Sequence, residues 1–168
     1  MTAMKEGDHI HLLLTILDQA YDHPSWHGTN LRGSIRRVSP AQASWRPGPS
    51  RHNIWELVVH AAYWKYAAWR RLAGADRGSF PIKGSNWFRR PPEEARSFER
   101  VWKADVALMD QAHASLRERV AQLSPRELHL TPRGSKVSNV ALISGVAAHD
   151  LYHAGQIQLL KRLAVTAS

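Results

Sequence analysis

Three histidines in two distant parts of the chain have the residue type and spacing of metal ligands. His149 and His153 are four residues apart in HDLYHAGQ, which reads as a helix, so their side chains share one face with Cβ atoms roughly 5–6 Å apart. His60 lies in a strongly apolar segment, where a lone imidazole is costly unless it is hydrogen-bonded or bound to a metal. A histidine pair at this spacing, or a single histidine in an apolar segment, is more often found without a bound metal. The two features together favour one shared ion.

A divalent ion suits this donor set. Zinc binds histidine nitrogen at about 2.0–2.1 Å, and an i, i+4 pair supplies two such ligands without backbone strain. The chain contains no cysteine, so only histidine and carboxylate ligands are available. Three protein ligands leave a fourth position for water or substrate, which is typical of a reactive site. We expect the other histidines to compete poorly as ligands.

The residues around the histidine pair offer further chemistry. HDLYH invites comparison with H-E-x-x-H, in which the second residue is a general base. Asp150 is one methylene shorter than that glutamate, and we favour a structural partner for it. Tyr152 and Gln156 are candidates for lining the site or orienting a ligand, and plain packing is the alternative for both.

Four helical segments would position these residues. Apolar residues recur at three- and four-residue steps over 5–21, over 54–72, from Pro91 or Pro92 to about 124, and from about Ser138 to about 163. Asn53 and Glu56 have the spacing of a capping box. Long connections rich in Gly, Pro, Ser and Arg separate the first three segments, and residues 40–44 have the pattern of one helical turn.

The pattern predicts an all-α fold, with residues 1–168 forming one four-helix-bundle domain. The second segment is apolar on almost every side, so a side left uncovered by the bundle would suit a dimer interface. We expect no membrane span, because no apolar run approaches about 18 residues. The lack of cysteine and of an export signal favours a cytoplasmic location.

The formal net charge is +9 with histidines neutral. Clustered basic residues bind nucleic acid by releasing counterions from phosphates. Here the basic residues are dispersed along the chain, so we favour a solvated basic surface. An anionic small-molecule site near the metal is the second choice, and nucleic-acid binding is unlikely.

Two segments resemble the DinB-like superfamily of metal-binding helical bundles: NIWELVVHAAYWKYAAWRRL and HDLYHAGQIQLLKR. The segment LRGSIRRVSPAQASWRPGPSRH is similar to the crossover of that family. The resemblance implies an up-down-down-up bundle with long crossovers, and zinc or nickel bound by His60, His149 and His153. It also implies a homodimer and, from relatives of known activity, thiol-dependent S-transfer or isomerisation with a low-molecular-weight thiol.

Three hypotheses follow for function. The first is an S-transferase that acts on a small-molecule substrate, with Arg46 and Arg51 as candidate anchors for carboxylates of the thiol cofactor. The second is a metal-dependent hydrolase that uses Asp150 as base. The third is a stress-associated binding protein in which the metal only stabilises the bundle.

Overall fold

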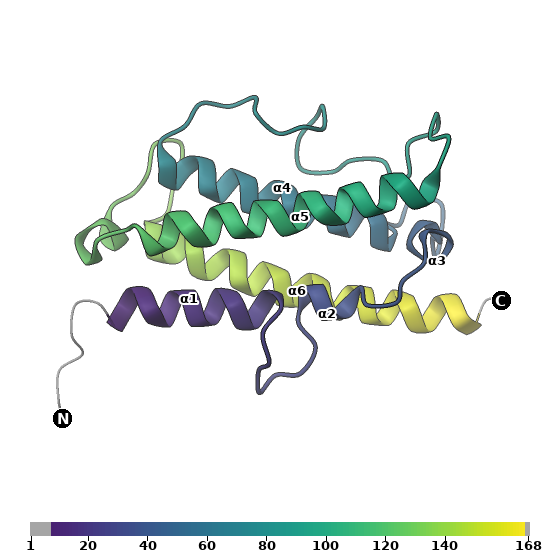
Figure 1. Cartoon of the computed structure of the whole chain (residues 1–168), viewed down its shortest axis with the longest axis horizontal. Helices are drawn as coiled ribbons and strands as arrows, with labels where there is room; N and C mark the ends of the chain where they lie inside the picture. The colour runs from purple at the N-terminus through teal and green to yellow at the C-terminus, as the bar shows by residue number, and fades with distance from the viewer. Residues whose placement is uncertain (1–7, 167–168) are drawn as a thin grey trace.

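All the secondary structure that the computed structural model describes, over residues 8–166, is helical, which confirms the all-α class. Four long helices dominate the molecule (Figure 1): α1 (Asp8–Tyr21), α4 (Ile54–Ala73), α5 (Phe98–Ala121) and α6 (Asn139–Thr166). Three short helices lie in the connections: α2 (Leu31–Ser34), α3 (Pro40–Ser44) and the 3-10 helix η1 (Pro125–His129). Residues 5–7 of the predicted first helix lie outside the described residues.

The long helices pack with their axes roughly aligned. Helix α4 contacts both α5 and α6, and α1 contacts the same two helices. In Figure 1, α1 and α6 begin at the left of the molecule, whereas α4 and α5 begin at the right. The two helices predicted to carry metal ligands, α4 and α6, are therefore antiparallel neighbours.

Helix α4 begins and ends with strong local signals. The Asn53 side chain accepts a hydrogen bond from the Glu56 backbone N–H at 2.8 Å, and the Glu56 carboxylate accepts one from the Asn53 N–H at 3.4 Å. This is the predicted capping box. At the other end Gly74 adopts a left-handed conformation with φ of 66°, which glycine tolerates without a Cβ penalty. The helix that carries His60 therefore begins at the predicted residue.

The predicted start of the third helix at Pro91 or Pro92 is wrong, since α5 begins at Phe98. Ser97 is the N-cap, and its hydroxyl accepts a hydrogen bond from the Arg100 backbone N–H at 3.3 Å. A serine side chain at the N-cap accepts a hydrogen bond from a free N–H group of the first helical turn. Proline fits in the first turn but supplies no such acceptor. Residues 91–96 belong instead to the connection that follows α4.

Helix α6 begins where predicted and ends slightly later than predicted. It begins at Asn139, directly after Ser138, and it continues to Thr166 rather than ending near residue 163. The Ser138 carbonyl accepts the first-turn hydrogen bond from the Leu142 N–H at 2.9 Å. The Asn139 side chain donates to the Glu127 carbonyl at 2.8 Å, which fixes the start of α6 against η1.

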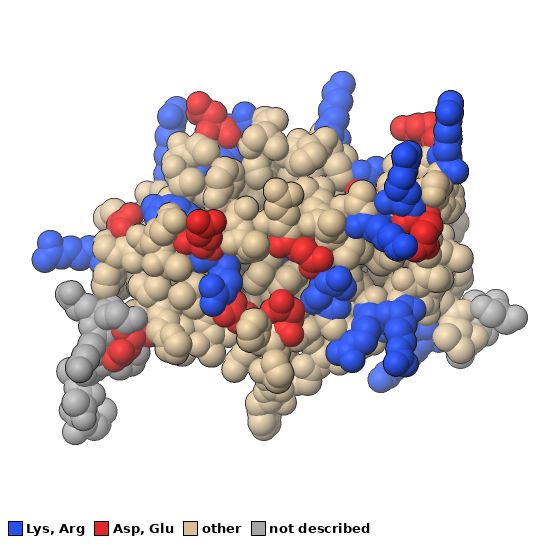
Figure 2. Space-filling model, viewed as in Figure 1, with Lys and Arg blue, Asp and Glu red and all other residues tan. Residues whose placement is uncertain are grey.

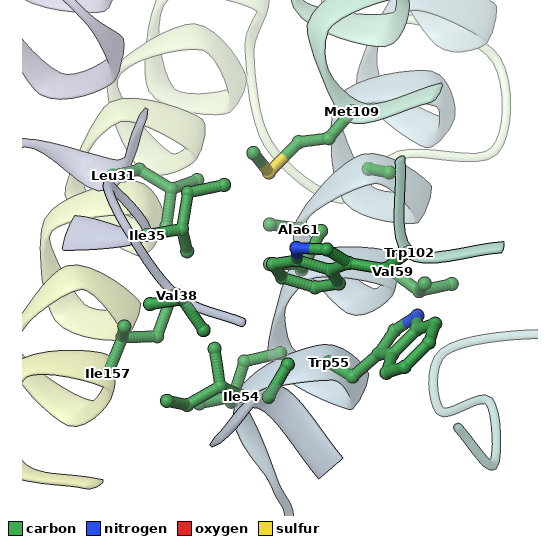
Figure 3. Packing of buried hydrophobic residues seen from close by; sticks show 14 of the residues in the cluster. Leu31, Ile35, Val38, Ile54, Trp55, Val59, Ala61, Trp102, Met109 and Ile157 are labelled. Carbon is green, nitrogen blue, oxygen red and sulfur yellow. The ribbon is translucent and has the colours of Figure 1, made fainter. Parts of the chain in front are cut away.

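The core packs against α4 from more than one side. Figure 3 shows Ile35, Val38 and Ile157 facing Ile54 and Trp102 across the interior. On another side, residues of the connection after α4 pack on this core, namely Phe80, Ile82 and Phe88. Part of the apolar surface of α4 outside the bundle is thus covered by the chain itself, whereas Trp64, Tyr66 and Trp69 stay half-buried.

The surface mixes charges of both signs. In Figure 2, acidic and basic side chains are interspersed over the middle of the visible face, and a group of basic side chains lies at the lower right. Surface ion pairs such as Arg32 with Asp110 at 2.9 Å and Lys103 with Glu99 at 2.9 Å compensate part of this charge. Among the described helices, none combines the length and apolar character that crossing a membrane would require.

Candidate metal centre

The structure brings the three predicted ligands together between α4 and α6. The Nε2 atom of His149 lies 3.1 Å from Nε2 of His60 and 3.0 Å from Nε2 of His153. In a tetrahedral shell with bonds of about 2.0–2.1 Å, ligand nitrogens are about 3.3–3.4 Å apart. Two of the three separations are therefore close to those around one ion, and all three donor atoms lie within 4.8 Å of one another.

Two of the imidazoles are held with Nε2 directed at this point. The Nδ1–H group of His60 donates to the backbone carbonyl of Asn86 at 2.7 Å. The Nδ1–H group of His153 donates to the Gln156 side-chain oxygen at 2.6 Å. A neutral imidazole has only one N–H group, so both Nε2 atoms carry lone pairs. Such outer hydrogen bonds fix the tautomer and ring orientation of metal ligands.

Without a cation, the three histidines cannot satisfy one another's hydrogen-bonding groups. His149 Nε2 lies between two Nε2 lone pairs and can donate at most one hydrogen bond, so one close nitrogen pair has no proton between its atoms. Nδ1 of His149 is also buried and has no hydrogen-bond partner among the described residues. A divalent ion would accept all three lone pairs at once, and the donor set therefore fits a metal such as zinc.

Burial keeps these histidines neutral, as ligation requires. Desolvation lowers the pKa of His149 to about 3 and that of His153 to about 4, and it lowers the pKa of His60 as well. For His149, the neighbouring imidazoles add to the shift. Near neutral pH the ligands need to lose no proton before a metal binds.

Aromatic side chains surround the histidines. Trp87, in the connection after α4, stacks on His60 with ring centroids 3.8 Å apart and on His52 with centroids 3.6 Å apart. The Trp64 indole N–H donates to the Asn86 side chain at 3.0 Å. The same connection thus covers one face of His60 and supplies its hydrogen-bond acceptor.

The other predicted site residues have separate positions. Gln156 orients His153. Tyr152 is 65% exposed, with its ring centroid 5.1 Å from that of His153, so it lies at the rim of the cluster. Asp150 points away from the histidines and forms an ion pair with Lys65. The carboxylate is fully buried there, as the structural interpretation predicted.

The predicted arginine anchors lie in a pocket next to the centre. This pocket has a volume of about 280 Å³, and Arg46, Arg51, Arg89 and Trp87 are among its lining residues. Arg46 donates to both carboxylate oxygens of Glu56, at 2.9 and 2.7 Å, so that carboxylate neutralises its charge. Arg89 forms an exposed ion pair with Glu93 at 3.0 Å, so Arg51 is the lining arginine that leaves the pocket basic.

The remaining histidines lie away from the cluster or at its edge. His113 is buried on α5 and stacks on Tyr21 with centroids 3.8 Å apart. The six others are exposed: His9, His11, His23, His27, His52 and His129. Of these six, His52 lies nearest to the cluster and is separated from His60 by the Trp87 ring. None of the seven histidines belongs to the metal-binding group found among the described residues.

Sequence reasoning missed two contributors to the site, Asn86 and Trp87, and it missed Lys65 as the partner of Asp150. The first two lie in a segment that we treated only as a connection. Its Trp87 and Phe88 pair in an otherwise polar stretch was the available signal, since adjacent large aromatics favour burial. No pattern in the sequence singled out Lys65.

Comparison with known proteins agrees with this geometry. No match was found among curated proteins or among solved structures. A sequence model of the DinB superfamily matches residues 25–157, a range that contains the three histidines and most of the bundle. The chain belongs to the DinB superfamily.

Proposed function

We propose that this protein is a metal-dependent S-transferase that uses zinc or nickel to activate a low-molecular-weight thiol. The observation that carries this proposal is the convergence of three neutral Nε2 donors, without a fourth protein ligand among the described residues. A fourth protein donor would favour a purely structural ion instead. A bound divalent ion with a free position lowers the pKa of a coordinated thiol or water and polarises carbonyl groups.

The residues of the chain would keep this position ready for a ligand. His60 and His153 are oriented by Asn86 and Gln156, so little rearrangement is needed when the ion binds. Trp87 shields one face of His60 from water. The exposed Tyr152 ring would meet an incoming substrate at the rim.

The basic pocket beside the centre supports an anionic cofactor. Arg51 would hold a carboxylate group of a low-molecular-weight thiol. One face of Trp87 stacks on His60, and the residue also lines this pocket. A thiol bound by Arg51 would therefore have a short path to the metal.

The hydrolase hypothesis has less support. Its proposed base, Asp150, is fully buried against Lys65 and lies away from the histidine donors. A general base must come within hydrogen-bond reach of the proton that it removes. Asp150 has no such access to a water at the cluster.

Further features of the proposal concern assembly and location. The helix directions in Figure 1 support an up-down-down-up bundle for the single domain of residues 1–168. We infer a homodimer, with the half-buried aromatic residues of α4 as one candidate surface. We also infer a cytoplasmic location, where small thiols are kept reduced.

A coupling assay tests the reaction. Protein purified without a metal-affinity tag would be loaded with zinc or nickel and mixed with 1-chloro-2,4-dinitrobenzene and glutathione, cysteine or coenzyme A. The thiolate sulfur forms a bond to the ring carbon, chloride leaves, and the thioether is measured by its absorbance. We expect catalysis by the loaded protein and by its His129→Ala variant, and none by His60→Ala. Equal rates with and without metal would contradict the proposal.

A further inference from the structure

A second buried polar pair lies beside the histidine cluster and takes no part in metal binding. Lys65 of α4 and Asp150 of α6 form an ion pair in which both side chains are 0% exposed. Lys65 is five residues after His60, and Asp150 directly follows His149. The pair thus joins the two helices that carry the metal ligands, within two helical turns of those ligands.

Stability alone does not account for this pair. Burying two charges costs several kcal/mol each before their attraction is counted, and apolar residues of similar volume are often as stable or more stable. Hydrogen bonding compensates the Asp150 carboxylate only in part, since Oδ1 has no partner among the described residues. The Lys65 ammonium otherwise lies over the Tyr21 ring, 4.7 Å from its centroid.

Several of the residues packed near the cluster are small. Ala61 and Ala62 flank His60 on the C-terminal side, and Ala147 and Ala154 lie close to the histidines of α6; all four are buried. Their methyl groups supply no hydrogen bond or charge that could fix the position of one helix relative to the other. Metal ligation tolerates changes of only about 0.2 Å in ligand distances.

We propose that the Lys65–Asp150 ion pair aligns α4 with α6 and so holds His60 at ligand distance from His149 and His153. The inference rests on the proposed metal site and extends it to two positioning residues. An ion pair suits this role because it is directional and strongly penalises any shift that separates the charges. The pair would act on the metal only through the histidines.

A double substitution separates alignment from stability. In Lys65→Met/Asp150→Leu both charges are replaced by apolar groups, so no unpaired charge is left in the core. We expect this variant to fold with a urea midpoint equal to or above that of the unaltered chain when no metal is present. We expect its affinity for Co²⁺, measured by chelator competition, to fall at least tenfold, with a changed ligand-field spectrum.

The matched control is Asp18→Leu/Arg117→Met. That pair joins α1 to α5 at 2.7 Å, and neither helix carries a metal ligand. Its removal should leave Co²⁺ affinity and spectrum unchanged, whatever its effect on stability. A change in metal binding of equal size in both double variants would overturn the specific role of Lys65 and Asp150.

The outcomes distinguish the two proposals. If the unaltered chain binds no Co²⁺ or zinc, the metal site fails and the alignment role fails with it. If the unaltered chain binds metal and Lys65→Met/Asp150→Leu binds it equally tightly with the same spectrum, only the alignment role is overturned. A double variant that cannot fold would also overturn it, because the pair would then be needed for stability.

Discussion

Two buried polar groups, the Lys65–Asp150 ion pair and the histidine cluster, lie side by side between α4 and α6. They differ in how their charges and lone pairs are compensated. The Lys65–Asp150 pair contains both a cation and an anion, so its charges are compensated within the chain. The histidine cluster contains three neutral nitrogen atoms whose lone pairs face one another, and it contains no cation. The charges of the first group offset each other, although Asp150 Oδ1 has no hydrogen-bond partner among the described residues. The second group instead offers its lone pairs to a cation from outside.

The difference shows which part of the interior is structural and which is functional. A buried ion pair loses most when one partner is removed, because the other charge is left without compensation. Removing one ligand from the metal-free histidine cluster should change the stability of the protein little. Binding of a metal ion to the complete cluster should raise that stability. Perturbing each group should therefore affect a different measurement.

The largest effect is expected when the ion pair is broken on one side. Lys65→Ala leaves the Asp150 carboxylate buried without its cation, and we expect a loss of about 3–5 kcal/mol in the free energy of unfolding. Urea denaturation of metal-free protein measures this loss. Lys103→Ala, which breaks a pair whose side chains are 73% and 58% exposed, should cost about 1 kcal/mol or less. Equal losses would remove the distinction between the two pairs.

The next effect is stabilisation by metal. Zinc at a free concentration 100 times its dissociation constant should add about 2.7 kcal/mol to the unfolding free energy. The same zinc concentration should add almost nothing to His153→Ala, since two ligands hold the ion much more weakly. Thermal unfolding with and without zinc provides the comparison. Similar stabilisation of both proteins would place the ion elsewhere.

A smaller effect is expected from the hydrogen bond that orients His153. Gln156→Leu removes the acceptor 2.6 Å from Nδ1, and loss of such a partner typically lowers metal affinity about 10–100-fold. Gln158→Leu, on the same helix but outside the cluster, is the matched control. Chelator competition with zinc measures both variants. Unchanged affinity in Gln156→Leu would show that His153 is oriented without it.

The smallest effect is the dependence of metal-free stability on pH. The pKa of His149 is about 3 and that of His153 about 4 in the folded protein, below the value of about 6.5 in an unfolded chain. The unfolded chain therefore binds more protons below pH 6.5, and stability falls as the pH drops from there towards 3. Partial exposure of His149 limits the size of the loss.

A double variant isolates this contribution from that of the carboxylates. His149→Asn/His153→Asn should lose less stability than the unaltered chain between pH 6.5 and pH 5, where few carboxylates titrate. Urea denaturation at several pH values gives both curves. Parallel curves would mean that the two imidazoles are hydrated in the folded protein.

The parts of the fold that were predictable share a local cause. Periodic apolar residues placed the four long helices, and the Asn53–Glu56 box placed the start of α4. His149 and His153 were predictable as a pair because helix geometry alone sets their spacing. The convergence of His60 on that pair needed the additional inference that all three point into one interior.

The remaining features depend on contacts between distant segments. Asn86 and Trp87 act on His60 from a connection that has no periodic pattern. Lys65 resembles an ordinary charged residue until Asp150 is placed opposite it. Tertiary packing, which single-segment patterns do not contain, determined both of these features. The start of α5 has a local cause instead, since the prolines at 91 and 92 gave a start signal but the Ser97 cap decided the position.

Metal content of the protein, purified without added metal or an affinity tag and then equilibrated with zinc, tests the central claim most directly. Elemental analysis should find one ion per chain in the unaltered protein and in the exposed-histidine variants His52→Ala and His129→Ala. It should find almost none in His60→Ala or His153→Ala, provided that circular dichroism shows them folded. Stoichiometric metal in folded His60→Ala, or none in the unaltered protein, would contradict the three-histidine centre.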